Sequence, residues 1–383
     1  MKILIIHRSF ALVGGAERVI IDKSNYLAGQ GHKVLLASYE QGNHPVPYLL
    51  DSSVQMKDLD CRFFTLSKIP IYKRIFLFFR LKQRMRNSLK KLIHYFQPQV
   101  IVLASDWQYL IKDVLAAANP IPVISEFHNA YDFIFKKIGN NGNGLFVRLT
   151  RSYYKSSLKH FGRCFCLIVL TENDARHWRN HSGNVIVIPN PVALYPDVID
   201  DIPQKRGRII CVGRLNAQKR IDRLISAFQM IADRYPEWYI DVYGEGDMKT
   251  SLLQQIAENH LEGRIVLNEP IQTIFDEYKK SQFLVLSSEY EGRPLVLIEA
   301  MACGTPCISF DCPSGPKEII DDGVTGLLAE NDNIDDLAKK MEWMITHERE
   351  RKVMGENARK AAAMYKPEII MKKWEDVYTG IVT

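Results

Sequence analysis

The chain has 383 residues, of which 46% are hydrophobic and 25% are charged, and its formal net charge is +6. This length exceeds one ordinary hydrophobic core and suits two domains, and the composition excludes a disordered or fibrous protein. No apolar run is long enough to cross a bilayer, and the N-terminus lacks the charged, apolar and small-residue sections of a signal peptide. We therefore expect a cytoplasmic protein.

Positive charge is concentrated in the first half of the chain. Residues 1–190 contain 26 Lys and Arg against 12 Asp and Glu, whereas the remaining residues contain 24 against 32. No acidic residue lies between Asp60 and Asp106. This asymmetry predicts that the first half faces an anionic partner.

The first half alternates short β-rich runs with helical periods, which is the pattern of a parallel α/β sheet. Helices are expected over residues 16–30 and 74–96. The expected strands are Lys2–His7, His32–Tyr39, Gln99–Ser105, Pro122–His128, Cys166–Thr171 and Val185–Pro189.

The alternation restarts after a proline-containing, acidic segment at residues 190–207, which resembles a linker. Strands are then expected at Arg208–Val212, Tyr239–Tyr243, Arg264–Leu267, Phe283–Ser287 and Pro306–Phe310. Helices are expected over residues 219–235, 249–261, 295–303, 334–346, 349–364 and 367–378. The pattern predicts two Rossmann-like, doubly wound domains facing a cleft, with ligands beyond the carboxyl ends of the strands. Their expected bounds are residues 1–189 and 208–365, followed by a helical segment at 366–383.

The most informative stretch is Ser287–Pro306, where a buried strand is followed by a polar loop and a helix. Pro294 suits the first helical position. The amides of Leu295 and Val296 should then be unpaired at the helix start, where the helix dipole also favours phosphate.

Two glutamates flank this helix start, Glu291 in the loop and Glu299 in the helix. Their spacing alone indicates helix capping as readily as ligand binding. The apolar helix body and the stop at Gly304-Thr-Pro306 favour a ligand site, in which Glu299 could reach a sugar or ribose hydroxyl.

The segment EGRPLVLIEAMACGTP, with its Glu291-x7-Glu299 spacing, resembles the signature of the retaining glycosyltransferases of family 4, which have the GT-B fold. The resemblance covers essentially the whole chain and implies a C-terminal helix that crosses back to the first domain. Further matching segments are Val212–Leu215 with Gln218-Lys219, Gly244–Gly246, Gly323–Leu328, Gly14–Glu17 and Ser125–His128.

The resemblance implies roles for the second-domain residues. Arg214 and Lys219 would hold the donor diphosphate, and positioned cations stabilise charge that develops on a leaving group. Glu299 would contact the ribose, and Glu291 the donor sugar or its phosphate. The backbone at Gly292, Leu295 and Val296 would complete the diphosphate site. Taken singly, either cation is more often a solvated surface charge.

In the first domain, the resemblance implies that His128 binds the donor sugar near the reacting centre without acting as a base. A departing phosphate oxygen would instead accept the proton of the acceptor. Gly14 and Gly15 would let the loop after the first strand approach the diphosphate or acceptor closely. The alternatives are a structural histidine and a tight strand–helix turn.

We expect no catalytic metal and no cofactor beyond the nucleotide sugar. Asp58-x-Asp60 spells the metal motif of the other large glycosyltransferase fold, but it precedes no nucleotide-binding unit. The seven cysteines include no C-x-x-C pair, which favours buried thiols over a zinc site.

Residues 68–93 form a basic segment in which Phe78, Leu81, Met85, Leu89 and Leu92 recur at helical spacing. Such a helix can lie in an anionic membrane interface with Arg80, Arg84 and Arg86 at the headgroups or at a lipid-linked diphosphate. A solvated helix packed on the first domain is the alternative. The cations that extend this basic field are Lys136, Lys137, Arg148, Arg151, Lys155, Lys159 and Arg163.

The resemblance implies transfer of a hexose or N-acetylhexosamine from a UDP-linked sugar to a membrane-associated or lipid-linked glycan in polysaccharide biosynthesis. The enzyme would then be peripheral on the inner face of the cell membrane. A same-fold epimerase or phosphorylase, or a non-catalytic sugar-nucleotide-binding protein, remains an alternative. A nucleic-acid partner is not expected, because no recognised nucleic-acid-binding module is present.

Overall fold

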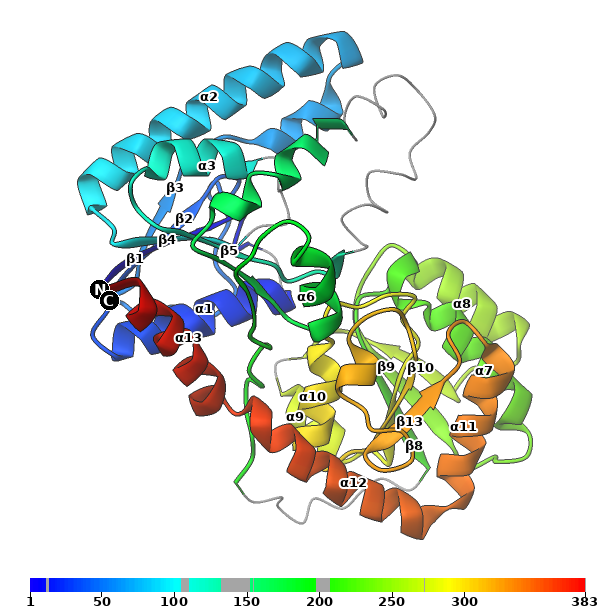
Figure 1. Cartoon of the computed structure of the whole chain (residues 1–383). Helices are drawn as coiled ribbons and strands as arrows, with labels where there is room; N and C mark the ends of the chain where they lie inside the picture. Colours follow the sequence, from blue (N-terminus) through cyan, green and yellow to red (C-terminus); the bar gives the residue numbers. More distant parts are fainter. Residues whose placement is uncertain are drawn as a thin grey trace. The chain divides into compact units, whose positions relative to one another are not determined.

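The structure, a computed structural model, describes residues 1–11, 14–104, 110–131, 152–153, 155–197, 207–271 and 273–382. The chain forms two compact units, one of Met1–Pro189 with Met371–Thr383 and one of Asn190–Ile370. Each unit contains one parallel sheet covered by helices (Figure 1). Each is described here by itself.

The first unit contains a seven-stranded sheet in the order β3-β2-β1-β4-β5-β6-β7. All neighbouring strands are parallel, and β1 lies between β2 and β4. The strands are β1 (Lys2–His7), β2 (Lys33–Ser38), β3 (Gln55–Asp58), β4 (Val100–Ala104), β5 (Val123–Glu126), β6 (Cys166–Val169) and β7 (Val185–Val187).

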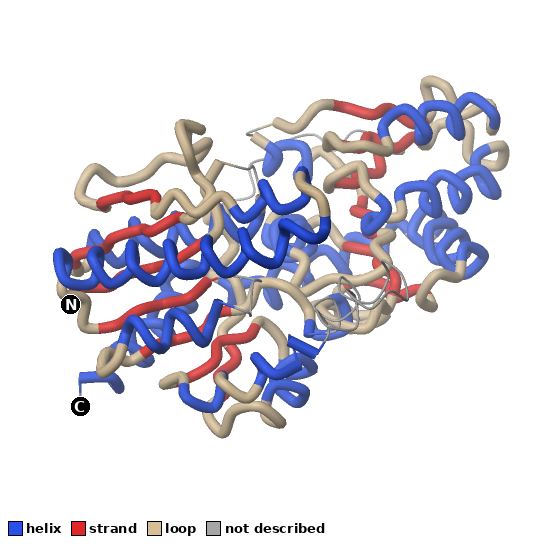
Figure 2. Tube along the Cα trace, turned by 90° about the horizontal axis from the view of Figure 1, so that it is seen from above, coloured by secondary structure: helices blue, strands red, loops and turns tan. Residues whose placement is uncertain are grey.

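Helices cover both faces of this sheet, which explains why its central strands are almost uniformly apolar (Figure 2). Helices α2 (Ile71–Phe96), α3 (Ile111–Ala118) and α6 (Glu172–Trp178) pack on one face. Helix α1 (Gly15–Gly29) and the end of α13 (Pro367–Val382) lie on the other (Figure 1). Two short 3-10 turns, at Phe63–Lys68 and Phe161–Arg163, complete the unit.

The second unit contains a six-stranded parallel sheet in the order β10-β9-β8-β11-β12-β13. Helices α7, α8 and α11 pack on one face, and α9, α10 and α12 on the other. The strands are β8 (Arg208–Val212), β9 (Tyr239–Tyr243), β10 (Ile265–Asn268), β11 (Phe283–Leu286), β12 (Cys307–Phe310) and β13 (Gly326–Ala329). The helices are α7 (Ile221–Ala232), α8 (Lys249–Glu258), α9 (Ile274–Lys279), α10 (Leu295–Ala302), α11 (Ile334–Thr346) and α12 (Glu348–Ala362).

The predicted α/β fold with two Rossmann-like sheets is confirmed, with differences at the level of single elements. The structure adds strands β3 and β13 and helices α3, α6 and α9 to the expected ones. Strand β3 is a polar sheet edge without an apolar run, so its sequence carries no strand signal. Of the expected linker, residues 190–197 pack on the second unit, where Val192 N–H donates to Tyr365 O (2.8 Å). Residues 198–206 lie outside the described part of the chain.

A buried arginine ties three elements of the second unit together. Arg208, the first residue of β8, is fully buried and lies 2.6 Å from both Asp241 of β9 and Glu277 of α9. Burial opposes ionisation of Glu277, but Lys280 and Arg208 outweigh it and lower its pKa to about 2. The three side chains therefore form a charged cluster that depends on all of its members.

All seven cysteines are buried and none is in a disulfide. Burial raises the pKa of each thiol, to about 12 for Cys61, Cys164, Cys166, Cys211, Cys303 and Cys312. Within the described ranges, no three His, Cys, Asp or Glu side chains are grouped as a metal site requires. None of the helices described is long and apolar enough to cross a membrane.

Candidate functional site

The carboxyl edge of the second sheet is built from loops that pack backbone against backbone. Leu215 N–H, in the loop after β8, donates to Glu245 O (2.8 Å) in the loop after β9. A Cβ at Gly244 would lie 1.9 Å from Gly213 O, and one at Gly246 would lie 2.2 Å from Leu215 O. Only glycine allows this approach, so the glycine turn positions the loop that carries the predicted diphosphate ligands.

The loop after β8 is also bonded to the loop after β11. Gln218 Nε2 donates to Tyr290 O (3.0 Å), and Ser287 Oγ donates to Lys219 O (2.9 Å). These bonds bring Lys219 Nζ to 2.7 Å from Glu291 Oε1. The stem of Lys219 lies along Gly213, whose absent side chain leaves room for it. Two predicted site residues, 72 positions apart, therefore form one ion pair.

Arg214 lies in the same loop as Lys219, but its environment differs. Its side chain is exposed and makes no ion pair or hydrogen bond with any residue that the structure describes. Glu291 therefore holds Lys219, whereas no described side chain holds the guanidinium of Arg214.

Helix α10 starts beside this ion pair. Pro294 is the N-cap residue (φ −68°, ψ 108°), one position earlier than predicted, and no side chain caps the helix. Leu297 N–H donates to Pro294 O (3.2 Å), so the amides of Leu295 and Val296 precede the first backbone bond of the helix. The amide dipoles of this end favour a negatively charged group.

The loop after β12 packs onto Gly292. A Cβ at Gly315, which has φ +93°, would lie 2.6 Å from Gly292 O. Arg293 secures the contact, because its guanidinium lies 3.3 Å from the Glu318 carboxylate and 5.1 Å from the centre of the Tyr365 ring. The backbone that the prediction assigns to phosphate is thus supported by a neighbouring loop.

Glu299 lies in the second turn of α10 and is buried. The Tyr278 hydroxyl, from the fully buried ring of α9, donates to Glu299 Oε2 (3.1 Å). Burial and the adjacent carboxylate raise the pKa of Tyr278 well above its ordinary value, so the hydroxyl remains a donor. Sequence reasoning missed Tyr278, because α9 is short and its tyrosine reads as a core residue.

In the first unit, Gly14 is the N-cap of α1 and Gly15 is its first residue. Gly14 N–H donates to the Tyr48 hydroxyl (2.9 Å), which donates back to Gly14 O (3.0 Å). A Cβ at Gly14 would lie 2.3 Å from Glu17 Oε2. Within the described residues, Tyr48 therefore bonds both the amide and the carbonyl of Gly14. Residues 12–13 of the predicted glycine loop lie outside the described part of the chain.

His128 lies two residues beyond β5, which ends at Glu126 and not at His128 as predicted. Its side chain is 6% exposed, and its Nε2 lies 3.3 Å from Glu126 Oε1. Neither ring nitrogen is aligned for a hydrogen bond with any group in the described ranges. Glu126 Oε2 also pairs with Lys23 Nζ at 2.5 Å.

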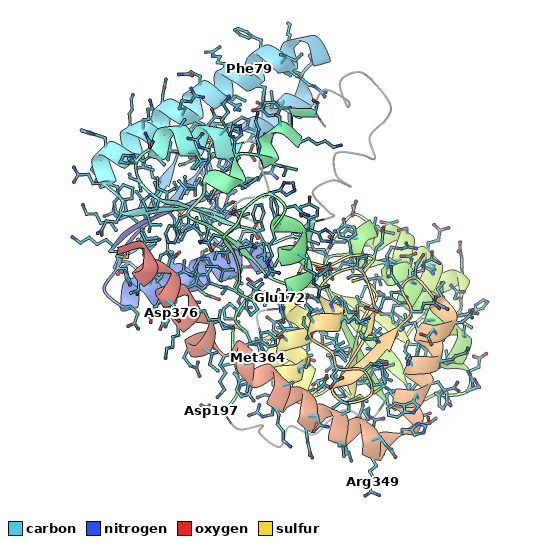
Figure 3. The ribbon with its side chains drawn as sticks, viewed as in Figure 1. Phe79, Glu172, Asp197, Arg349, Met364 and Asp376 are labelled. Carbon is cyan, nitrogen blue, oxygen red and sulfur yellow. The ribbon has the colours of Figure 1, made fainter. Side chains whose placement is uncertain are left out.

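The basic helix α2 differs from the prediction in which face it exposes. Leu81, Met85, Leu89 and Leu92, which were expected to form a membrane face, are buried against the sheet. The exposed apolar side chains are instead Ile75, Phe76 (75% exposed) and Phe79 (59% exposed), near the start of the helix. Figure 3 shows Phe79 on the outer side of α2.

The three predicted membrane arginines separate in the same way. Arg86 pairs with Asp113 (2.6 Å) and Arg84 pairs with Asp60, and both Arg84 and Arg80 are exposed. Asp58 and Asp60 each pair with Arg62. Arginine side chains therefore already neutralise this D-x-D pair. Lys155, Lys159 and Arg163 are exposed; Lys136, Lys137, Arg148 and Arg151 lie outside the described residues.

Two family descriptions match the chain. The family "Glycosyltransferase Family 4" matches residues 13–194, and "Glycosyl transferases group 1" matches residues 198–361. Together the two matches include most strands of the first sheet and every strand of the second.

Curated relatives align over nearly the whole chain. An uncharacterised glycosyltransferase of Haemophilus influenzae is 27% identical over 368 residues, covering 95% of this chain and 96% of that protein. The amylovoran biosynthesis glycosyltransferase AmsD of Erwinia amylovora is 26% identical over 383 residues, covering 98% and 99%. A Campylobacter jejuni N-acetylgalactosaminyltransferase, named for a glycan on PP-undecaprenol, is 24% identical over 364 residues, covering 94% of each.

Solved structures show the same fold. Sucrose-phosphate synthase from Thermosynechococcus elongatus has a TM-score of 0.80 at 18% identity, covering 100% of this chain and 99% of that one. Anabaena HepE in complex with UDP has a TM-score of 0.75 at 18% identity, covering 99% and 100%. Because family matches span both sheets and relatives align almost end to end, this chain belongs to the GT-B glycosyltransferases of family 4.

Proposed function

We propose that this protein transfers a hexose or N-acetylhexosamine, with retention of configuration, from a UDP-linked sugar to a membrane-associated or lipid-linked glycan. One observation carries the proposal: Lys219 and Glu291 form a 2.7 Å ion pair beside the uncapped start of α10. This arrangement presents one cation and the amides of a helix start to an incoming diphosphate.

The donor competes with Glu291 for Lys219. A diphosphate oxygen that takes the place of the Glu291 carboxylate leaves Glu291 free to accept hydrogen bonds from hydroxyls of the donor sugar. The backbone at Gly292, Leu295 and Val296 would bind the same diphosphate, and exposed Arg214 would close over it. Glu299, held by Tyr278, would accept from the ribose hydroxyls. The UDP bound to the structurally similar HepE supports uridine as the nucleotide.

The chemistry follows from this placement of charge. The acceptor oxygen bonds to the anomeric carbon on the face from which the sugar–phosphate bond breaks. The acceptor proton passes to the departing phosphate oxygen, and Lys219 and Arg214 offset the charge that develops on the UDP. His128 contacts the donor sugar. These groups require no metal ion.

The acceptor side rests on the relatives and on α2. The names of AmsD and of the Campylobacter enzyme point to surface polysaccharide and to a polyprenol diphosphate-linked glycan. Exposed Ile75, Phe76 and Phe79 next to Arg80 have the composition of an element that enters an anionic membrane interface. The enzyme would therefore work on the inner face of the cell membrane.

The test begins with UDP-glucose, UDP-galactose and their N-acetylamino forms, each screened for thermal stabilisation of the purified protein. The stabilising donor is then incubated with and without an undecaprenyl diphosphate-linked oligosaccharide. We expect UDP release only with acceptor, and an NMR coupling constant of the new linkage that matches the donor anomer. Conversion of the donor without acceptor would identify an epimerase, and binding without turnover would identify a non-catalytic protein.

A further inference from the structure

Three side chains of the first unit lie in a row: Lys23 in the middle of α1, Glu126 of β5 and His128. Lys23 is 0% exposed and Glu126 is 2% exposed, and Lys23 Nζ lies 2.5 Å from Glu126 Oε2. The second carboxylate oxygen, Oε1, lies 3.3 Å from His128 Nε2. Burying two charges is costly unless each is paired, and here the ammonium group and the carboxylate pair with each other.

Helix α13, the last helix, covers the ammonium group of Lys23. The Trp374 ring of α13 lies with its centre 3.7 Å from Lys23 Nζ, within the range of a cation–π contact. Tyr26 of α1 donates to Glu375 of α13 (3.1 Å), which fixes the two helices together. Lys23 is thus held from both sides and has no access to solvent or substrate.

A second buried ion pair, between Lys82 and Asp113, serves as a comparison for the Lys23–Glu126 pair. Lys82 of α2 pairs with Asp113 of α3 at 2.7 Å and lies over the rings of Phe78 and Tyr153. That pair joins two helices, and its carboxylate is shared with a second cation, Arg86. The Lys23–Glu126 pair differs because its carboxylate also faces His128, whose ring nitrogens have no hydrogen-bond partner within the described ranges.

We infer that Lys23 is a positioning residue for His128: by pairing with Glu126, it holds in place the carboxylate that faces Nε2 of the ring. Nδ1 then faces a hydroxyl of the donor sugar, from which it can accept a hydrogen bond only while the ring is neutral. This inference rests on the proposed function, in which His128 contacts that sugar. It adds Lys23, Glu126 and Trp374 to the residues that determine transfer, although none of them touches a substrate.

The charges around the ring support this assignment. Burial opposes ionisation of Glu126, but the ammonium group of Lys23, the largest opposing cause, holds its pKa below the ordinary value. The other titratable groups near Glu126 are Cys166 of β6 and Tyr378 of α13, and burial raises the pKa of both. Both are neutral at physiological pH, so Lys23 supplies the compensating charge.

Removing the charge of Lys23 has a consequence that a packing role would not have. In Lys23→Met, the Glu126 carboxylate keeps only His128 as a possible cation, so the ring takes up a proton. A protonated ring donates from both nitrogens and offers no acceptor. Transfer should fall about tenfold at neutral pH and recover as the pH rises and the ring loses its proton.

The experiment is an NMR titration of protein labelled at histidine Cε1, with the His128 signal assigned from its loss in His128→Asn. We expect the His128 midpoint to move up by roughly one pH unit in Lys23→Met and to stay at the wild-type value in Lys23→Arg. Lys82→Met, which removes the other buried lysine, should leave the midpoint unchanged. Lys23→Gln, which retains a donor without charge, replaces Lys23→Met if that variant does not fold.

The pH profile of kcat/KM is measured in parallel, and the two readouts separate the two proposals. An unchanged midpoint in folded Lys23→Met or Lys23→Gln would overturn the role of Lys23, whatever the activity. A shifted midpoint in a protein that transfers no sugar would leave the buried coupling standing and refute the proposed function. A shifted midpoint with a matching alkaline shift of the profile supports both.

Discussion

Lys219 Nζ and Glu291 Oε1 lie 2.7 Å apart, although the two residues follow different strands of the second sheet. The loops that carry them are joined by further hydrogen bonds, including Gln218 Nε2 to Tyr290 O and Glu289 N to Gln218 O. These bonds between the two loops support the ion pair. A diphosphate that binds Lys219 has to displace the Glu291 carboxylate from the ammonium group. Lys219 should therefore raise the affinity for the donor, and Glu291 should lower it.

The first prediction concerns the competition between the diphosphate and Glu291 for Lys219. Lys219→Ala should weaken UDP binding by 10- to 100-fold, because a charge-assisted hydrogen bond contributes about 1.5–3 kcal/mol. Glu291→Gln should leave UDP affinity equal or higher, because it removes the competitor, and should still lower transfer. Isothermal titration calorimetry with UDP measures both, and Lys249→Ala, at an exposed surface pair with Glu269, is the control. Equal weakening by both substitutions would contradict the competition.

The second prediction concerns the glycine turn after β9. Gly244→Ala should destabilise the second unit by roughly 2 kcal/mol or more, because its Cβ would lie 1.9 Å from Gly213 O. UDP binding should weaken as well, because the displaced loop carries Lys219. Gly29→Ala is the control: nothing lies within 4 Å of its Cβ position in α1, so it should be neutral or slightly stabilising. Thermal unfolding followed by circular dichroism tests the pair.

The third prediction concerns the Arg208 cluster. Arg208→Met leaves the half-buried Asp241 without its buried cation and Glu277 with Lys280 alone, and should cost roughly 1–3 kcal/mol of stability at pH 7. The pKa of Glu277 is lowered from 4.5 to about 2, so its contribution is complete above pH 4.5 and is lost as the pH falls toward 2. The difference between wild type and variant should therefore shrink between pH 4.5 and 2. A difference that does not change with pH in urea unfolding would refute the ionic origin.

The fourth prediction concerns the start of α2. Phe76→Ser with Phe79→Ser should lower binding to phosphatidylglycerol vesicles about tenfold or more, because two large exposed apolar side chains are lost. Arg80→Ser should lower binding at low salt and have little effect at high salt. Tyr95→Ser, an exposed aromatic near the other end of the same helix, is the control. Co-sedimentation that is the same for all variants would exclude this face as a membrane contact.

The fold could be predicted from the sequence where strands are buried on both faces. Strands β1, β4, β8 and β11 are short apolar runs, and that composition is diagnostic. Strand β3 was missed because an edge strand needs no apolar run, and Gln55 and Lys57 resemble loop residues.

The face of α2 shows a different limit. Helical periodicity correctly grouped Leu81, Met85, Leu89 and Leu92, but a periodic apolar stripe does not reveal whether it meets a sheet or a membrane. The residues left exposed, Phe76 and Phe79, lie outside this stripe, so the periodicity does not point to them.

The sequence identified some residues of the candidate site but not the partners that hold them. Motif spacing identified Lys219, Glu291 and Glu299 as individual residues. Their partners depend on contacts between distant segments: Lys219 with Glu291, Glu299 with Tyr278, and His128 with the buried Lys23–Glu126 pair. A sequence pattern carries no signal for Lys23, because a lysine in the middle of a helix is ordinarily solvated.

The burial of every native thiol makes the protein suitable for site-directed labelling. With their pKa values raised and their sulfur atoms shielded, the native cysteines should react slowly with maleimides at neutral pH. A cysteine introduced at an exposed position such as Arg349 or Asp376 would then carry a fluorophore selectively. Energy transfer between one dye on each unit would then measure the distance between the units with and without UDP, without first replacing the native thiols.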